Sequence, residues 1–206
     1  MMRDLLAHAK REFDFSVTEH EMTILHEDGQ YRHLRFQKPG TSIYWFDLIT
    51  WPYHLVISGD LEAFHFSREE DMFGFFASSG HKSEGGINPH YWGEKIQGSS
   101  PWRVFSPEKF TQIVVEDFWE RRHDYDGDVV ELWRAIREDV LAWSEDEHEA
   151  RSVLHNFRHR DARNVCTDFE FYDTWEWSFT DYDVHYLRSL HAIVWGIATY
   201  RKEKAK

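Results

Sequence analysis

The segment LRFQKPGTSIYWFDLITWPYHLVISGDLEAFHFSREEDMFGFF runs from Leu34 to Phe76 and contains most of the information about architecture. It consists of short runs in which β-branched and aromatic residues alternate with polar ones, a pattern typical of half-buried strands. Turn sequences separate these runs: Lys38-Pro39-Gly40, Trp51-Pro52 and Gly59-Asp60. Because short turns join neighbouring antiparallel strands, the segment predicts a β-meander.

Working outward, the sequence predicts four or five strands, at about residues 22–26, 30–36, 42–50, 54–58 and 62–67. The dipeptide Asp28-Gly29 is a favoured two-residue hairpin turn and joins the first two. Before them, the first dozen residues have apolar positions at helical spacing. The stretch 77–86 is polar and rich in glycine, which predicts a flexible loop.

After Ser67 the apolar period changes to about 3.6 residues, which indicates helices. Ser67 is predicted to cap a short helix ending near residue 76, and Ser106-Pro107 is a second start signal. Asp128 with Glu131 resembles a capping box. Further helices are expected at about 145–158 and from Asp183 onward. The predicted class is α+β: an N-terminal helix, an antiparallel meander of four or five strands, then a helical half packed on one face of the sheet. We expect one domain over residues 1–206, with a helical subdomain over 107–206 as the alternative.

The Leu34–Phe76 segment resembles an uncharacterised family of small proteins encoded by tailed bacteriophages and prophages. The likeness continues through INPHYWGEKI at residues 87–96, FSPEKF at 105–110 and the aromatic C-terminal helix, so it covers most of the chain. The resemblance implies a phage genome as the setting and a bacterial host cell as the location. It implies no activity and no catalytic residues.

Charge is distributed unevenly along the 206-residue chain, whose formal net charge is −13. Residues 116–183 hold 20 Asp and Glu against 8 Lys and Arg, a net of −12. Such a field repels nucleic acid and attracts basic surfaces, although an acidic face can also serve solubility alone. Cys166 is the single cysteine, and we find neither a membrane span nor a signal peptide, so we expect a cytoplasmic protein without disulfides.

Two patterns suggest metal ligands, and neither is complete. The run DYDGD at 124–128 gathers carboxylates, but its glycine is at the fourth position where an EF-hand requires the sixth, and an interhelical turn explains the same residues. His155 and His159 would share one face of an unbroken helix, but His148 is too far away to complete the coordination sphere of the same metal ion. We therefore predict no bound metal and no cofactor.

Catalytic signatures are also missing. The P-loop, the nucleophile elbow and the dinucleotide fingerprint are all absent. His54, Asp60 and His65 lie on neighbouring predicted strands and could converge as in a hydrolase, although turn or cross-strand roles account for them as well. We predict no catalytic residue and favour a binding protein over an enzyme.

Two hypotheses about function result. In the first, the chain is a phage-encoded acidic inhibitor of a host nucleic-acid-binding defence complex, of the anti-CRISPR or anti-restriction type, acting by DNA mimicry without itself binding nucleic acid or membrane. In the second, it is a small metal-dependent hydrolase or nuclease with His and Asp ligands. Homodimerisation is compatible with either. For the first hypothesis the predicted partner-binding residues are Asp124, Asp126, Asp128, Glu145, Asp146, Glu147, Glu149, Trp175 and Trp177.

Overall fold

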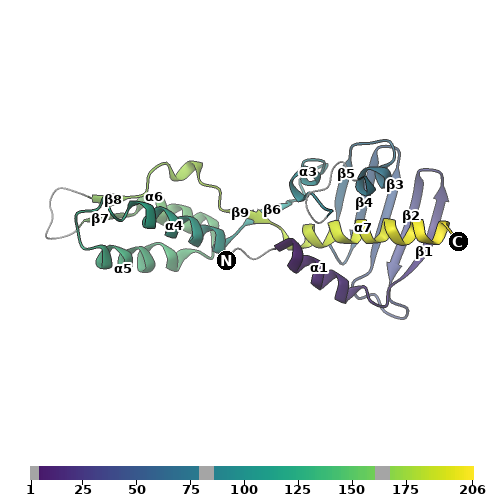
Figure 1. The fold of residues 1–206 in the computed structure, drawn as a ribbon, viewed down its shortest axis with the longest axis horizontal. Helices are drawn as coiled ribbons and strands as arrows, with labels where there is room; N and C mark the ends of the chain where they lie inside the picture. Colours follow the sequence, from purple (N-terminus) through teal and green to yellow (C-terminus); the bar gives the residue numbers. More distant parts are fainter. Residues whose placement is uncertain (1–4, 79–85, 161–167) are drawn as a thin grey trace. The chain divides into compact units, whose positions relative to one another are not determined.

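The computed structural model describes residues 5–78, 86–160 and 168–206 of a chain that divides into two compact units (Figure 1). Unit 1 comprises residues 1–102 and 182–206, and unit 2 comprises residues 103–181. Unit 2 is therefore inserted into the sequence of unit 1. The chain enters and leaves it through β6 (Arg103–Phe105) and β9 (Thr180–Tyr182), which pair with each other.

Unit 1 contains a five-stranded sheet in the order β1-β2-β3-β4-β5, with antiparallel neighbours, so the predicted meander is confirmed. The strands are β1 (Glu21–Asp28), β2 (Tyr31–Gln37), β3 (Phe46–Trp51), β4 (His54–Gly59) and β5 (Phe64–Ser67). Asp28 pairs with Tyr31, so the first turn consists of Gly29 and Gln30, one position later than predicted. Gly29 has a positive φ of 60°, which a glycine adopts without strain.

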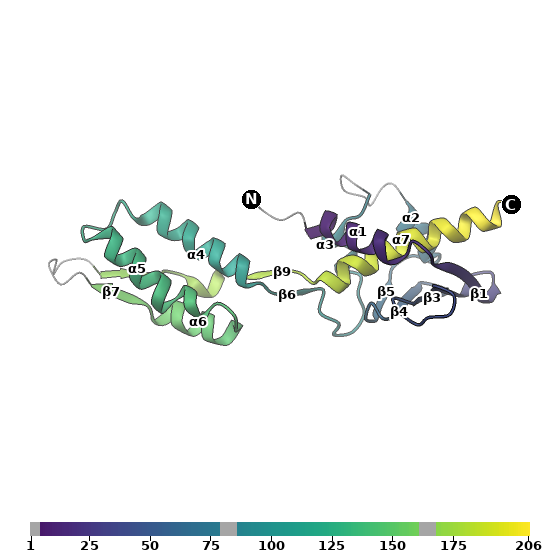
Figure 2. The same cartoon turned by 90° about the horizontal axis from the view of Figure 1, so that it is seen from below.

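The helices of unit 1 lie on one side of this sheet (Figure 2). They are α1 (Leu5–Ser16), α2 (Met72–Ala77), α3 (Pro89–Gly93) and α7 (Val184–Lys204). Phe13 of α1 and Trp195 of α7 both contact Phe46 on β3, with ring centroids 6.3 and 6.2 Å away. α7 approaches the sheet closely at Gly196, where a Cβ atom would lie 2.7 Å from Leu48. The small residue thus permits the α7 packing that completes the core.

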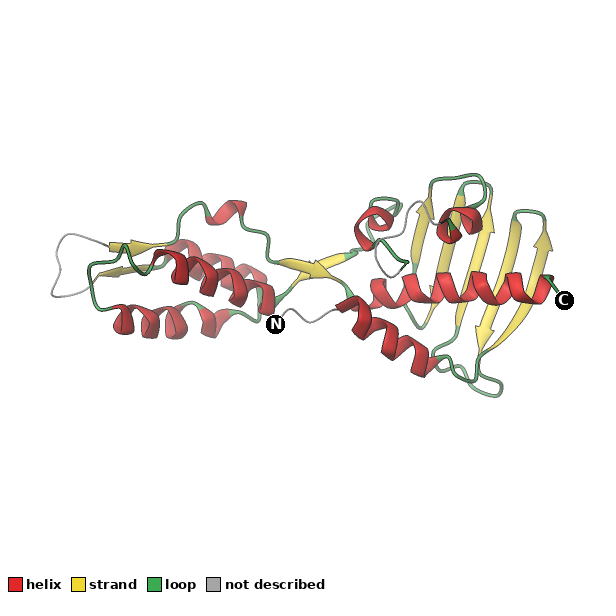
Figure 3. Cartoon of the chain, viewed as in Figure 1, coloured by secondary structure: helices red, strands yellow, loops and turns green. Residues whose placement is uncertain are grey.

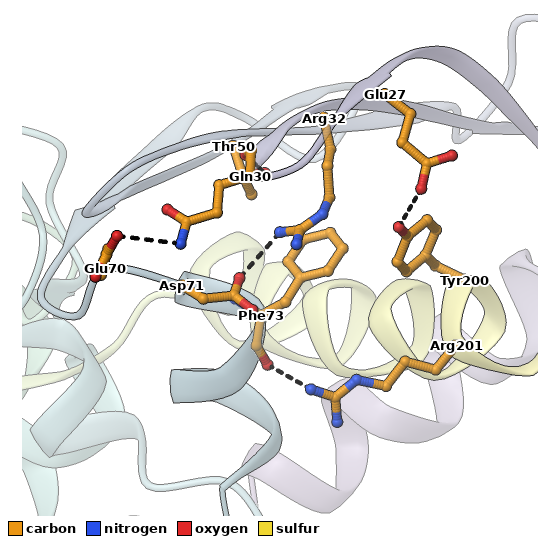
Figure 4. A network of polar contacts seen from close by, with 9 residues as sticks. All are labelled: Glu27, Gln30, Arg32, Thr50, Glu70, Asp71, Phe73, Tyr200 and Arg201. Atoms are coloured by element: carbon orange, nitrogen blue, oxygen red, sulfur yellow. Dashed lines mark hydrogen bonds and ion pairs between the residues drawn. The ribbon is translucent and has the colours of Figure 1, made fainter. Parts of the chain in front are cut away.

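A polar network fastens α2 and α7 to the start of β2 (Figure 4). The guanidinium of Arg32 donates to Asp71 at 2.9 Å and lies 4.8 Å from the ring centroid of Phe73. Asp71 also caps α2 by accepting from the backbone N–H of Phe73 at 3.1 Å. From α7, Arg201 donates to the Phe73 carbonyl. One carboxylate therefore serves both an ion pair and a helix cap.

Unit 2 is helical and has a hydrophobic cluster of its own (Figure 3). Its elements between β6 and β9 are α4 (Pro107–Arg121), α5 (Val129–Asp139), η2 (Leu141–Trp143), α6 (Glu147–Asn156), β7 (Arg158–Arg160), β8 (Asp168–Glu170) and η3 (Thr174–Glu176). Ser106 caps α4 through a hydrogen bond from Lys109, and Asp128 caps α5 through bonds from Val130 and Glu131. Both predicted start signals are confirmed.

Three expectations need correction. Asp71 and not Ser67 caps α2, because Ser67 still belongs to β5, where its backbone N–H bonds to the Lys95 carbonyl. The predicted helix at 145–158 ends at Asn156, since Phe157 has extended backbone. Of the helices after Pro107, α7 covers the sheet, whereas α4, α5 and α6 surround the second cluster. The helical unit accordingly ends at residue 181, before the boundary expected for the 107–206 subdomain.

Within the described part of the chain, no helix is both long and apolar enough to cross a membrane. Most of the loop predicted at 77–86 falls outside the described residues, as does Cys166.

Candidate functional site

Charge divides unequally between the two units. Residues 103–181, which form unit 2, contain 20 Asp and Glu against 10 Lys and Arg, a net of −10. That leaves −3 of the total −13 for unit 1. Unit 2 therefore carries most of the negative charge that would attract a basic surface.

The acidic residues predicted to bind a partner form two patches. The loop patch is Asp124, Asp126 and Asp128, between α4 and α5. The helix patch is Glu145, Asp146, Glu147 and Glu149, at the start of α6. α5 separates them: the loop patch precedes its first residue and the helix patch follows its last. An 11-residue helix is about 16 Å long, so the two patches are distinct surfaces instead of one continuous face.

Three of these carboxylates have structural tasks. Asp128 caps α5, and Asp146 caps α6 by accepting from the Glu149 backbone N–H at 2.9 Å. Glu147 forms an ion pair with Arg151 one turn later, at 2.9 Å. The other four are exposed and, within the described residues, form no ion pair: Asp124, Asp126, Glu145 and Glu149. These four carboxylates are therefore accessible at the surface of unit 2.

The two predicted tryptophans have different environments. The side chain of Trp175 is 72% exposed, on the turn η3. Trp177 is half-buried and packs edge-on against Phe171 and Phe179, with centroids 5.9 and 6.2 Å away. The exposure expected for part of this aromatic cluster is thus confirmed for Trp175, and Trp177 anchors the segment to the unit 2 core.

A hollow of about 480 Å³ lies between α6 and the η3 segment. Its apolar lining is supplied by Leu154, Phe179 and Trp175, and α6 contributes a polar side. The polar lining residues are His148, Arg151, Ser152, His155, Asn156 and Thr174. The volume falls in the range of small-molecule sites. The helix patch begins the same helix, so the hollow and this patch belong to one region of unit 2.

His155 and His159 do not form the predicted pair of ligands on one helix face. α6 ends at Asn156, so His155 is on the helix while His159 lies on β7, and the four-residue spacing no longer places both on one helical face. Across the described ranges, no group of three or more His, Cys, Asp or Glu side chains could hold a metal ion. Asp124 to Asp128 form the interhelical turn that was the alternative interpretation.

On the sheet, two of the three candidate hydrolase residues meet. His54 Nδ1 and His65 Nε2 are 2.9 Å apart, and the Trp51 ring stacks on His54 with a centroid distance of 4.9 Å. Asp60 instead accepts a hydrogen bond from the Tyr44 backbone N–H at 2.7 Å. Among the described contacts, Asp60 therefore does not join the His54–His65 pair as the hydrolase hypothesis requires. Burial, and then the nearby His54, lower the pKa of His65 below its usual value of 6.5.

This lowered pKa gives stability a pH dependence. His65 takes up a proton more readily in the unfolded chain, so its contribution is present above pH 6.5 and is lost as pH falls through the lower folded pKa. His65→Gln should therefore reduce the decline in melting temperature between about pH 7 and 5. Exposed His26→Gln is the matched control and should leave the decline unchanged. Identical melting profiles for wild type and His65→Gln would contradict the expectation.

Sequence reasoning missed the α6 side of the hollow, including Arg151, Ser152 and Asn156. In the sequence, these residues look like an ordinary exposed helix face. Only the tertiary fold brings Trp175 and Phe179, which follow β8 in the chain, against them. One local signal in the sequence is the aspartate at position 173, a residue type that tolerates the left-handed region better than most, and Asp173 has a φ of 52°. That conformation begins the turn that exposes Trp175.

The chain matches no protein-family model, no curated protein and no solved structure. The resemblance to phage-encoded proteins therefore stays a prediction.

Proposed function

We propose that this protein is a binding protein whose acidic unit 2 occupies a basic surface of a partner protein, where that partner otherwise holds nucleic acid. The observation that carries the proposal is the concentration of charge: unit 2 has a net charge of −10, and four of the carboxylates predicted to bind a partner are exposed and have no internal ion pair among the described residues. Lys and Arg that bind phosphates are complementary to such a surface.

The position of two of these carboxylates supports the same proposal. Glu145 immediately precedes the Asp146 cap and Glu149 lies in the first turn of α6, so both are near the start of one helix, where basic side chains of a partner can contact them. With the phage setting that the resemblance implies, the partner we propose is a host defence complex of the CRISPR or restriction type.

The hydrolase alternative receives no comparable support. Its candidate ligands His54 and His65 pair with each other, and Asp60 is engaged with Tyr44.

Protection of phage from nuclease-based defence tests this proposal. Expressing the protein in cells with one defence system at a time should raise the plaquing efficiency of a sensitive phage in at least one of them. With the purified complex from that system, the protein should compete with a target DNA duplex, so that each lowers the apparent affinity for the other. Unchanged plaquing against every system, or a complex that binds duplex and protein together at full affinity, would contradict the proposal.

A further inference from the structure

Trp175 lies on a turn that backbone hydrogen bonds and buried neighbouring residues hold in place. The backbone of η3 is closed by hydrogen bonds from Glu176 N–H to the Asp173 carbonyl at 2.9 Å and from Trp177 N–H to the Thr174 carbonyl at 3.3 Å. Thr174 is buried, and Trp177 packs into the unit 2 core. An exposed ring on an ordered turn loses little conformational entropy on binding, which favours its use as an interface anchor.

Elsewhere in unit 2, aromatic rings are covered by arginines of the same chain. The guanidinium of Arg122 lies 4.0 Å from the Trp119 ring centroid, and that of Arg121 lies 4.6 Å from Tyr172. In the hollow itself, Arg151 lies 4.8 Å from Phe179. Trp175 is more exposed than Trp119 or Tyr172, and among described residues it has neither a cation nor a ring partner.

Two carboxylates flank this uncovered ring in sequence. Asp173 precedes the η3 turn and Glu176 is its last residue; both are exposed, and neither forms an ion pair within the described part of unit 2. An indole face attracts cations, and carboxylates pair with them. Arginine suits such a site better than lysine, because its planar guanidinium can stack on the ring and donate to a carboxylate at the same time.

We propose that Trp175 and the adjoining hollow bind an arginine side chain of the partner protein. The guanidinium stacks on the exposed indole and pairs with Asp173 or Glu176. The inference rests on the proposed function in taking unit 2 as the docking unit. The one arginine that lines the hollow does not oppose it, since Glu147 pairs with Arg151 at 2.9 Å.

Peptide binding tests this site without the natural partner. Hexa-arginine and hexa-lysine amides are titrated into the full chain at low salt and pH 8, where imidazole carries no charge, and tryptophan indole N–H signals are followed by NMR. Trp175→Ala identifies the signal of Trp175. We expect hexa-arginine to shift this signal and to bind about fivefold more tightly than hexa-lysine, and Trp175→Ala to remove that preference.

Matched variants distinguish peptide binding at Trp175 from general attraction between the acidic protein and a cationic peptide. Trp119→Ala removes a ring that already carries Arg122 and should leave the preference for arginine intact. Asp173→Asn with Glu176→Gln should weaken hexa-arginine binding about threefold, and asparagine tolerates the left-handed backbone at position 173. Equal affinities for the two peptides, or an arginine preference that survives Trp175→Ala, would overturn the proposal. Reversal of Asp124, Asp126, Glu145 and Glu149 leaves Trp175 in place, so its effect on partner capture tests the proposed function separately.

Discussion

Replacing Asp124, Asp126, Glu145 and Glu149 with lysine is expected to weaken partner binding by at least about tenfold without unfolding the chain. These are the members of the predicted partner-binding set that are exposed and have no ion pair among the described residues. Asp128, Asp146 and Glu147 are left unchanged because they cap helices or pair with Arg151. Exposed substitutions of this kind usually change stability by within about 0.5 kcal/mol each. Affinity for the captured partner, measured at low and at moderate salt, gives the readout, with circular dichroism to check the fold.

A control with the same charge change in unit 1 isolates the effect of position. Glu12, Glu21, Asp28 and Glu62 are exposed and likewise form no ion pair within the described residues. Their reversal to lysine also shifts the net charge from −13 to −5. We expect this control to bind nearly as well as wild type, because screening limits attraction between distant charges to about 8 Å at physiological salt. If both variants weakened partner binding equally, the effect would come from the net charge of the chain and not from the position of the carboxylates in unit 2.

The second large effect concerns stability: Arg32→Ala should lower the free energy of unfolding by about 3 kcal/mol. The Arg32 side chain is only 12% exposed and ties β2 to the α2 cap and to the Phe73 ring (Figure 4). Removing it leaves Asp71 without its ion pair and opens space beside Phe73 and Tyr200. Denaturant unfolding of the purified chain measures the loss.

Variants at Asp71 distinguish the contribution of its ion pair to stability from that of its helix cap. Asp71→Asn keeps a good capping residue and removes only the charge, so it should cost less than Asp71→Ala, by roughly 1 kcal/mol. Because the Asp71 side chain is 41% exposed, water compensates part of the lost pairing in either variant. A double variant, Arg32→Ala with Asp71→Asn, should cost less than the sum of the two single changes. Additive costs would show that Arg32 acts through its packing alone.

The candidate site divides into parts that the sequence predicts and parts that it does not. The excess of Asp and Glu in the second half of the chain and the exposure of part of the aromatic cluster are properties of composition, and the structure retains both. The grouping of these residues is not a local property. Asp124 and Glu145 were predicted to bind the same partner, yet α5 separates their patches.

The histidines also show the difference between what local sequence predicts and what the tertiary fold decides. His155 and His159 share a face only if the helix continues past Asn156, and packing of Phe157 into the second cluster ends it there. His54 and His65 meet because the β4–β5 register places His65 opposite Val56, next to His54 on the same face. A register shift of one residue would move one imidazole to the other face of the sheet.

By itself, the sequence determines the strand order, most of the turns and the starts of α4, α5 and α7, because alternation, turn residues and capping side chains act over only a few residues. It does not determine that α7 returns to the sheet while α4, α5 and α6 surround a core of their own, nor that Trp175 borders a hollow on α6. Those outcomes depend on contacts between residues far apart in the chain. Their free energy comes from burying apolar surface in a particular shape, which no local pattern specifies.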